Sequence, residues 1–109
     1  MAVDVTDAEA IAEAVLTVVK TLGSIEHLCC FAGIVGCYHA MEMTESQWRK
    51  TLDVNTTGSF LCAQAVAKQI AAQKTGGGSI TFTASISGHR VNYPQPQIAY
   101  NVRYVQQWL

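Results

Sequence analysis

Short apolar runs alternate along this chain with longer segments whose apolar residues recur at helical spacing, and this alternation restricts the possible folds most. The strand-like runs cover 1–5, 25–32 and 79–85, and the helical patterns cover 7–22, 44–74 and 98–109. A strand-helix-strand order indicates right-handed crossovers and therefore an α/β fold with a mostly parallel sheet. Ligands bind such sheets beyond the carboxyl ends of the strands, which is where Gly33, Ser85 and the loop after Ser85 fall.

Capping residues predict where the first helix begins and ends. Thr6, followed three residues later by Glu9, has the pattern of a capping box, so we expect this helix to start at Asp7. Gly23 stands where a C-terminal glycine belongs. The apolar residues between these ends share one face, which makes the helix one-sided.

The long helix 44–74 has a clear start and a weak middle. Thr44 is its expected N-cap. Asn55 opens a run of poor helix formers that ends at Gly58, so we expect one helix with a weak point at Asn55. Gly76–Gly78 breaks the pattern before the next strand and is interpreted as a solvated turn.

The composition limits the class of protein and its partners. The 109 residues suffice for a single domain, 1–109, and a content of 50% hydrophobic and 14% charged residues fits a globular interior. The net charge of −1 includes no basic run, so we expect no nucleic-acid partner. Because no apolar stretch approaches the roughly 20 residues of a membrane span and the N-terminus lacks a signal-peptide pattern, we expect a cytoplasmic protein with no membrane partner.

The cysteines and histidines do not form a recognisable site. The cysteines lack C-x-x-C spacing, and we interpret them as small buried hydrophobic residues. The histidines are dispersed, with no His-x-x-x-His pair and no Cys/His cluster, so no metal site is expected. These residues are Cys29, Cys30, Cys37, Cys62, His27, His39 and His89.

Three polar residues form the candidate catalytic set. Ser85 ends a strand, Tyr100 follows fifteen residues later near the start of a helix, and Asn55 lies at the weak point of another helix. A serine, a tyrosine and an amide are hydrogen-bonding groups suited to polarising a carbonyl. Any one of them alone is more often a cap or a satisfied interior group, so the hypothesis depends on their order and spacing.

That order resembles the successive motifs of the short-chain dehydrogenase/reductase family. The matching segments are Asp4-Val5, Ala32-Gly33, Asp53–Gly58, Ser85–Gly88 and Tyr100-Asn101. The stretch 82–89, followed by 94–97, is most similar to the fungal sorbose, xylulose and mannitol reductase branch. The resemblance implies a partial Rossmann-type, doubly wound parallel sheet in three α/β/α layers, without its first β-α-β unit and truncated at both ends.

The resemblance also implies a reaction and its catalytic residues. The family transfers hydride between NADP or NAD and a substrate, here a small carbonyl or polyol of the sugar type. In this sequence Ser85 would polarise the carbonyl, Tyr100 would exchange the proton and Asn55 would hold a relay water. Ser87 is a weaker candidate for the role of Ser85.

The same resemblance implies a cofactor site formed by two short segments. Asp4 and Val5 would contact the adenine, and the turn at Ala32 and Gly33 would pack near the cofactor ribose.

The sequence departs from the family pattern at four places. The family's lysine, four residues after the tyrosine, is replaced by Tyr104, and Arg103 could supply charge there or be a solvated surface residue. Cys30-Phe31 precedes Ala32-Gly33, where the family has an asparagine. No glycine-rich phosphate-binding turn occurs in the sequence. In the family's strand order, strand 1–5 has no neighbouring strand here, so only 25–32 and 79–85 can pair.

From these departures we expect little or no catalysis by these 109 residues alone. The alternative is a non-catalytic interaction module that forms homo-oligomers through the helix 44–74, whose apolar surface would be uncovered. A flavodoxin-like binding domain is a third interpretation, without a phosphate loop to support it.

Overall fold

The computed structural model describes residues 1–105, which group into two compact units. The first unit comprises Met1–Ala32 and Gly58–Thr83, and the second comprises Gly33–Thr57 and the chain from Ala84. No helix in the described part of the chain is both long enough and apolar enough to cross a membrane.

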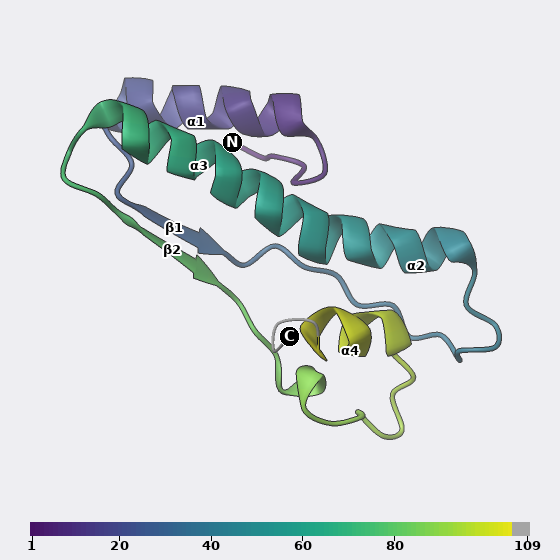
Figure 1. The fold of residues 1–109 in the computed structure, drawn as a ribbon. Coiled ribbons are helices and arrows are strands. Elements are labelled where there is room, and N and C mark those ends of the chain that lie inside the picture. Colours follow the sequence, from purple (N-terminus) through teal and green to yellow (C-terminus); the bar gives the residue numbers. More distant parts are fainter. Residues whose placement is uncertain (106–109) are drawn as a thin grey trace. The chain divides into compact units, whose positions relative to one another are not determined.

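The first unit is built around two parallel strands (Figure 1). Its elements are α1 (Ala8–Leu22), β1 (His27–Cys30), α3 (Ser59–Gln73) and β2 (Ser79–Phe82). The strands pair in register from His27 opposite Ser79 to Cys30 opposite Phe82. The predicted pairing of these two runs is therefore confirmed, although both strands are shorter than expected.

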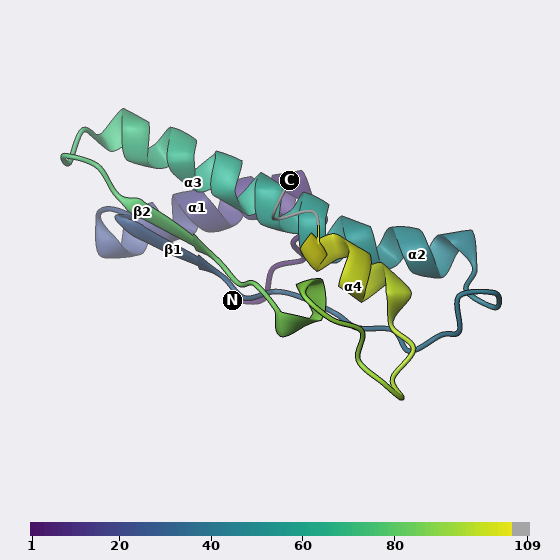
Figure 2. The ribbon, with the colours of Figure 1, turned by 60° about the horizontal axis from the view of Figure 1, so that its bottom comes forward.

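One face of this sheet is covered by helices. Leu28, Cys30 and Ile80 are half-buried on that face, while the intervening residues are exposed. Helices α1 and α3 lie together on one side of the strands, with Ile11 and Val66 in the core (Figures 1 and 2). The described residues of this unit thus form two layers, one of strands and one of helices, because α1 and α3 lie on the same face of the sheet (Figures 1 and 2).

The predicted first strand is wrong. Residues 1–5 form no strand, because no neighbouring strand in the described chain pairs with their backbone. The segment 1–5 lies instead against Gly58, the residue that precedes α3. A Cβ added at Gly58 would be 2.7 Å from Val5 Cγ2 and 3.0 Å from the Val5 carbonyl oxygen. The absence of a side chain at Gly58 allows this close approach.

The predicted N-cap of the first helix is wrong by one residue. Asp7 is the N-cap, and its carboxylate accepts from the N–H groups of Glu9 (2.9 Å) and Ala10 (3.1 Å). Thr6 instead donates twice to the Asp4 carboxylate, which removes it from the capping position. The predicted end of the helix is confirmed, since Gly23 has φ of 93° and donates its N–H to the Val19 carbonyl.

The second unit contains mostly helices and long loops. Helix α2 (Glu45–Leu52) runs into the π-helical turn η1 (Asp53–Gly58), and the later elements are the short turn η2 (Ile86–Gly88) and helix α4 (Ile98–Val105). The predicted cap at Thr44 and weak point at Asn55 are confirmed, and Gln47 completes an unpredicted capping box. The expected continuation of the last helix to residue 109 lies outside the described residues.

We predict that Gly58→Ala destabilises the fold by about 1–3 kcal/mol, because the new methyl group displaces the Val5 segment. Urea unfolding followed by circular dichroism measures the loss. Gly33→Ala is the matched control, since its Cβ would make only ordinary contacts, the closest at 3.5 Å. Equal stability of the Gly58 variant and the parent would contradict the close packing of Val5.

Candidate active site

The second unit brings together the elements that hold the three candidate catalytic residues. Ser85 precedes η2, Tyr100 lies on α4 and Asn55 lies in η1. Turn η2 packs closely on α4, because a Cβ at Gly88 would lie 2.6 Å from the Tyr104 carbonyl oxygen. Asn101 strengthens this packing by donating to the Ser87 carbonyl at 2.7 Å.

The structure separates the two candidate serines by their surroundings. Ser87 is buried, and its hydroxyl accepts from the Gln97 amide at 3.2 Å, which fixes the loop to α4. Ser85 is half-buried, and its Oγ accepts the Ser87 N–H at 3.2 Å as the cap of η2. A hydroxyl oxygen that accepts one bond still has a proton to donate. Both hydroxyls keep such a proton, and because Ser85 is the less buried of the two, it suits a carbonyl-polarising role better than Ser87.

Asn55 is the most deeply buried of the candidates, at 1% exposure. Its Oδ1 accepts the Ile34 N–H and its Nδ2 donates to the Ile34 carbonyl, each at 2.8 Å. Asn55 Oδ1 also lies 3.5 Å from the point where a Cβ on Gly33 would stand. The side chain of Asn55 therefore fixes the turn that contains Gly33.

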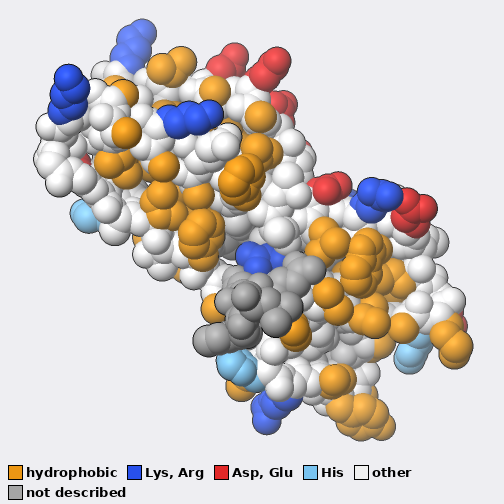
Figure 3. All heavy atoms as spheres, viewed as in Figure 1, with side chains coloured by type: hydrophobic (Ala, Val, Ile, Leu, Met, Phe, Trp, Pro, Cys, Tyr) orange, Lys and Arg blue, Asp and Glu red, His pale blue; other side chains and the backbone are white. Residues whose placement is uncertain are grey.

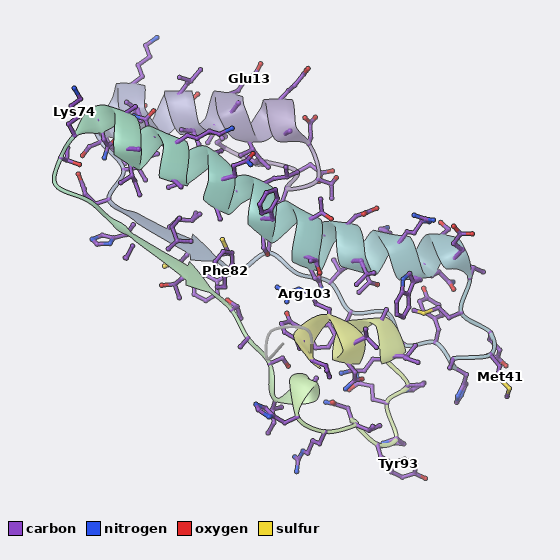
Figure 4. All side chains as sticks on the ribbon, viewed as in Figure 1. Glu13, Met41, Lys74, Phe82, Tyr93 and Arg103 are labelled. Atoms are coloured by element: carbon purple, nitrogen blue, oxygen red, sulfur yellow. The ribbon has the colours of Figure 1, made fainter. Side chains whose placement is uncertain are left out.

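The interpretation of Arg103 as a solvated surface charge is wrong. Its side chain is 7% exposed, and Nε donates to the Asn55 backbone carbonyl at 2.7 Å (Figure 4). The π-helical turn changes the usual helical bonding of its carbonyls, which provides an acceptor for the guanidinium. Arg103 thus stabilises the backbone at Asn55.

Tyr100 and Tyr104 lie one helical turn apart on α4 and their rings touch. The ring centroids are 4.7 Å apart with the planes inclined at 60°, and the Arg103 guanidinium carbon lies 5.0 Å from the Tyr104 centroid. Tyr104 is buried, whereas Tyr100 is half-buried. Burial, followed by the hydrogen bond to Tyr100, raises the pKa of Tyr104 to about 12.

Three of the four predicted cofactor residues lie in the first unit. The Asp4 carboxylate is exposed, and hydrogen bonds from the backbone and side chain of Thr6 hold its pKa below the usual value. Val5 and Ala32 line one cavity of about 90 Å³. The structure therefore places Val5 beside the predicted ribose turn, and the fourth residue, Gly33, lies in the second unit next to Asn55.

Sequence reasoning missed the structural roles of Arg103, Tyr104 and Asn101. For Arg103 and Tyr104 the available signal was helical spacing, because residues three and four positions after Tyr100 share its side of the helix, whereas Asn101 carries no such signal. At position 104 the sequence shows the absence of the family's lysine, and the burial of the tyrosine there depends on packing.

We predict that Asn55→Ala lowers the free energy of unfolding by about 1–3 kcal/mol, because the Ile34 N–H and carbonyl lose their partners. Chemical denaturation measures the change. Asn92→Ala is the matched control, since the Asn92 side chain accepts only a long hydrogen bond, from the Asn101 amide at 3.4 Å. A similar loss of unfolding free energy in both variants would show that the Asn55 bonds to Ile34 do not stabilise the fold more than the Asn92 contact does.

Comparison with known proteins identifies relatives of this arrangement. Residues 1–101 match the family model described as short chain dehydrogenase. The NADP-dependent mannitol dehydrogenase of Alternaria alternata is 36% identical over 85 residues, 78% of this chain and 31% of that protein. Sorbose reductase sou1 of Schizosaccharomyces pombe is 35% identical over 80 residues, 72% of this chain and 31% of that protein.

A solved structure shows the same backbone arrangement. A short-chain type dehydrogenase/reductase from Mycobacterium marinum matches 96% of this chain and 42% of its own, with a TM-score of 0.91 and 34% identity. The chain spans about a third of the length of the two curated relatives. The family predicted from the motifs is confirmed, and the chain belongs to the short chain dehydrogenases.

Proposed function

We propose that this chain provides the proton-transfer part of an NADP- or NAD-dependent oxidoreductase that acts on a small carbonyl or polyol substrate. The observation that supports this most is the packing of η2 on α4, which places the elements of Ser85 and Tyr100 together. Asn55 lies in the same unit. The named mannitol and sorbose relatives support a substrate of the polyol or sugar-ketone type.

In the direction of reduction, a hydride reaches the carbonyl carbon and a proton reaches its oxygen. Ser85 would donate a hydrogen bond to that oxygen and stabilise the charge that develops there. Tyr100 would give its phenolic proton to the same oxygen as the general acid. Asn55 would hold the relay water through which Tyr100 is reprotonated.

Four residues would hold part of a nicotinamide dinucleotide. Asp4 and Val5 would contact the adenine, and Ala32 and Gly33 would face the ribose. Gly33 suits this role because it is exposed, and the turn that contains it is held by the hydrogen bond from the Ile34 N–H to Asn55 Oδ1. When bound, the cofactor would supply the hydride. No glycine-rich turn between a strand and a helix occurs among residues 1–105, so these residues supply no such cradle for the pyrophosphate.

Self-association through the helical region 44–74 is the second candidate function. Phe60, on α3, is 57% exposed, and Figure 3 shows apolar side chains gathered on the surface in the region of α3. An exposed aromatic side chain on a helix is suited to a contact with another copy of the chain. Sedimentation velocity of the parent and of Phe60→Lys tests this: a monomeric parent would exclude the contact.

We predict that NADPH or NADH binds the folded chain weakly but saturably, because its contacts lie at the adenine and ribose and not at the pyrophosphate. Titration followed by cofactor fluorescence measures the affinity. Gly33→Ala should weaken binding while leaving stability nearly unchanged, since its Cβ makes ordinary contacts within the protein. A folded chain with no saturable response to either cofactor would refute the cofactor part of the proposal.

Where turnover of a ketose or polyol is detectable, Tyr100→Phe and Ser85→Ala should each reduce kcat by about 10²–10⁴-fold. Tyr93→Phe is the control for loss of a phenolic hydroxyl, because Tyr93 is 94% exposed, and it should leave kcat unchanged. Turnover that survives Tyr100→Phe would remove Tyr100 from the mechanism.

A further inference from the structure

We propose that Arg103 is a positioning residue for the proposed reaction: its hydrogen bond to the Asn55 carbonyl holds helix α4, and with it Tyr100, in place beside η1. This inference rests on the proposed function, because it assigns Arg103 a role in the reaction only if Tyr100 and Asn55 take part in it. None of the proton-transfer steps uses Arg103 directly. The observations that assign it a role are its burial and its contact with η1.

Arg103 carries its charge into the interior of the second unit. A guanidinium is always protonated in a protein, yet the residue is only 7% exposed. Removing a charged group from water is costly unless directed hydrogen bonds replace its hydration. Nε donates to the Asn55 carbonyl at 2.7 Å, a distance typical of a charge-assisted hydrogen bond. The bond therefore attaches α4 to η1 at one defined point.

Helix α4 is attached to its surroundings from two sides. Asn101 donates to the Ser87 carbonyl at 2.7 Å, which holds α4 to η2. Arg103 lies two residues further on, and two residues turn an α-helix through about 200°, so these two side chains leave α4 on nearly opposite sides. A helix attached on one side only could rotate about that attachment. Arg103 therefore supplies a second attachment, which joins the helix of Tyr100 to Asn55.

The attachment continues from Asn55 to the turn that is expected to face the ribose. The Asn55 side chain bonds both backbone groups of Ile34 at 2.8 Å, and its Oδ1 lies 3.5 Å from the point where a Cβ on Gly33 would stand. A displacement of the Asn55 backbone would therefore move this turn as well. The helix of the proton donor, the relay amide and the turn are thus linked through the bond from Arg103.

Three substitutions at position 103 separate the hydrogen bond from the charge. Nε of arginine is bonded to Cδ, and Nε2 of glutamine is bonded to the equivalent carbon, so Arg103→Gln keeps an N–H donor at this place without the charge. Arg103→Met puts a methyl group there. Arg103→Lys puts a methylene group there and keeps the charge one bond further on. The proposal requires Arg103→Gln to resemble the parent, and the other two variants to differ from it.

The first measurement is the proton–nitrogen NMR signal of the Ile34 amide, whose N–H is bonded to Asn55 Oδ1 at 2.8 Å. Arg103→Met and Arg103→Lys should shift the amide proton upfield, because a displaced Asn55 lengthens that hydrogen bond. Arg103→Gln should leave the signal near its parent position. A residue that only stabilises the fold would change the free energy of unfolding and leave this signal of the folded state where it is.

The second measurement separates kcat from KM. Where turnover of a ketose or polyol is detectable, Arg103→Met and Arg103→Lys should lower kcat by about 10–100-fold with KM nearly unchanged, because the proton donor is misplaced and no substrate contact is removed. Arg103→Gln should keep most of the parent kcat. Arg49→Met is the matched control, since the Arg49 side chain is 70% exposed, and it should leave the Ile34 signal and kcat unchanged.

An unmoved Ile34 signal in Arg103→Met would overturn the proposal, as would an order in which Arg103→Lys resembles the parent and Arg103→Gln does not. A displaced Ile34 signal with an unchanged kcat would also overturn it, because Arg103 would then be structural only. The NMR signals need neither cofactor nor turnover. An unmoved signal would therefore refute the role of Arg103 while the proposed function stands, whereas turnover that survives Tyr100→Phe would refute the proposed function with the signal still displaced.

Discussion

Two primary amides hold the ends of the central run of this chain, and much of the fold depends on them. Gln73 accepts the Ile25 N–H at 3.1 Å and donates to the Ile25 carbonyl at 2.6 Å, before β1. Asn55 bonds in the same way to Ile34, after β1. An amide has one donor side and one acceptor side, so it can satisfy both backbone groups of a single residue as a neighbouring strand would. This explains how a run predicted over 25–32 is ordered although only His27–Cys30 pairs as a strand.

The role of Asn55 extends beyond its side chain. Its carbonyl accepts from Arg103, so one residue links the turn at Gly33 to helix α4 within the second unit. The π-helical turn makes this possible, because a wider turn redirects backbone groups that a regular helix would use internally. Asn55, the first of the poor helix formers that marked a weak point in the sequence, thus supplies the link.

Elements with local determinants could be predicted from the sequence. The cap at Thr44, the end at Gly23 and the irregular turn at Asn55 depend on neighbours within a few residues, and all three are confirmed. The pairing of β1 with β2 was predictable from family strand order. The N-cap was misplaced because Asp7 and Thr6 are both good caps, and the choice depended on Asp4 engaging Thr6.

The residues that were not predictable are those whose state depends on packing. A strand at 1–5 requires a partner, and its alternating side chains cannot reveal whether one is present. Arg103 was assigned to the surface because an arginine is rarely buried without acceptors, and the acceptor is a carbonyl in η1, far away in sequence. The candidate site residues were predicted from motif order, which fixes identity and spacing but not burial.

The burial of Arg103 gives a physical reason for the neutral residue at position 104. An ammonium there would be almost fully removed from water and would lie beside a guanidinium, so desolvation and like-charge repulsion would both oppose it. A phenol avoids both costs at neutral pH and packs its ring against Arg103. Because the pKa of Tyr104 is raised from 10 in the unfolded chain to about 12, its contribution to stability is complete below pH 10 and is lost as the pH rises towards 12. The arginine and the tyrosine are therefore best understood as a pair, in which the charge stabilises the backbone at Asn55 and the adjacent side chain stays neutral throughout the physiological range.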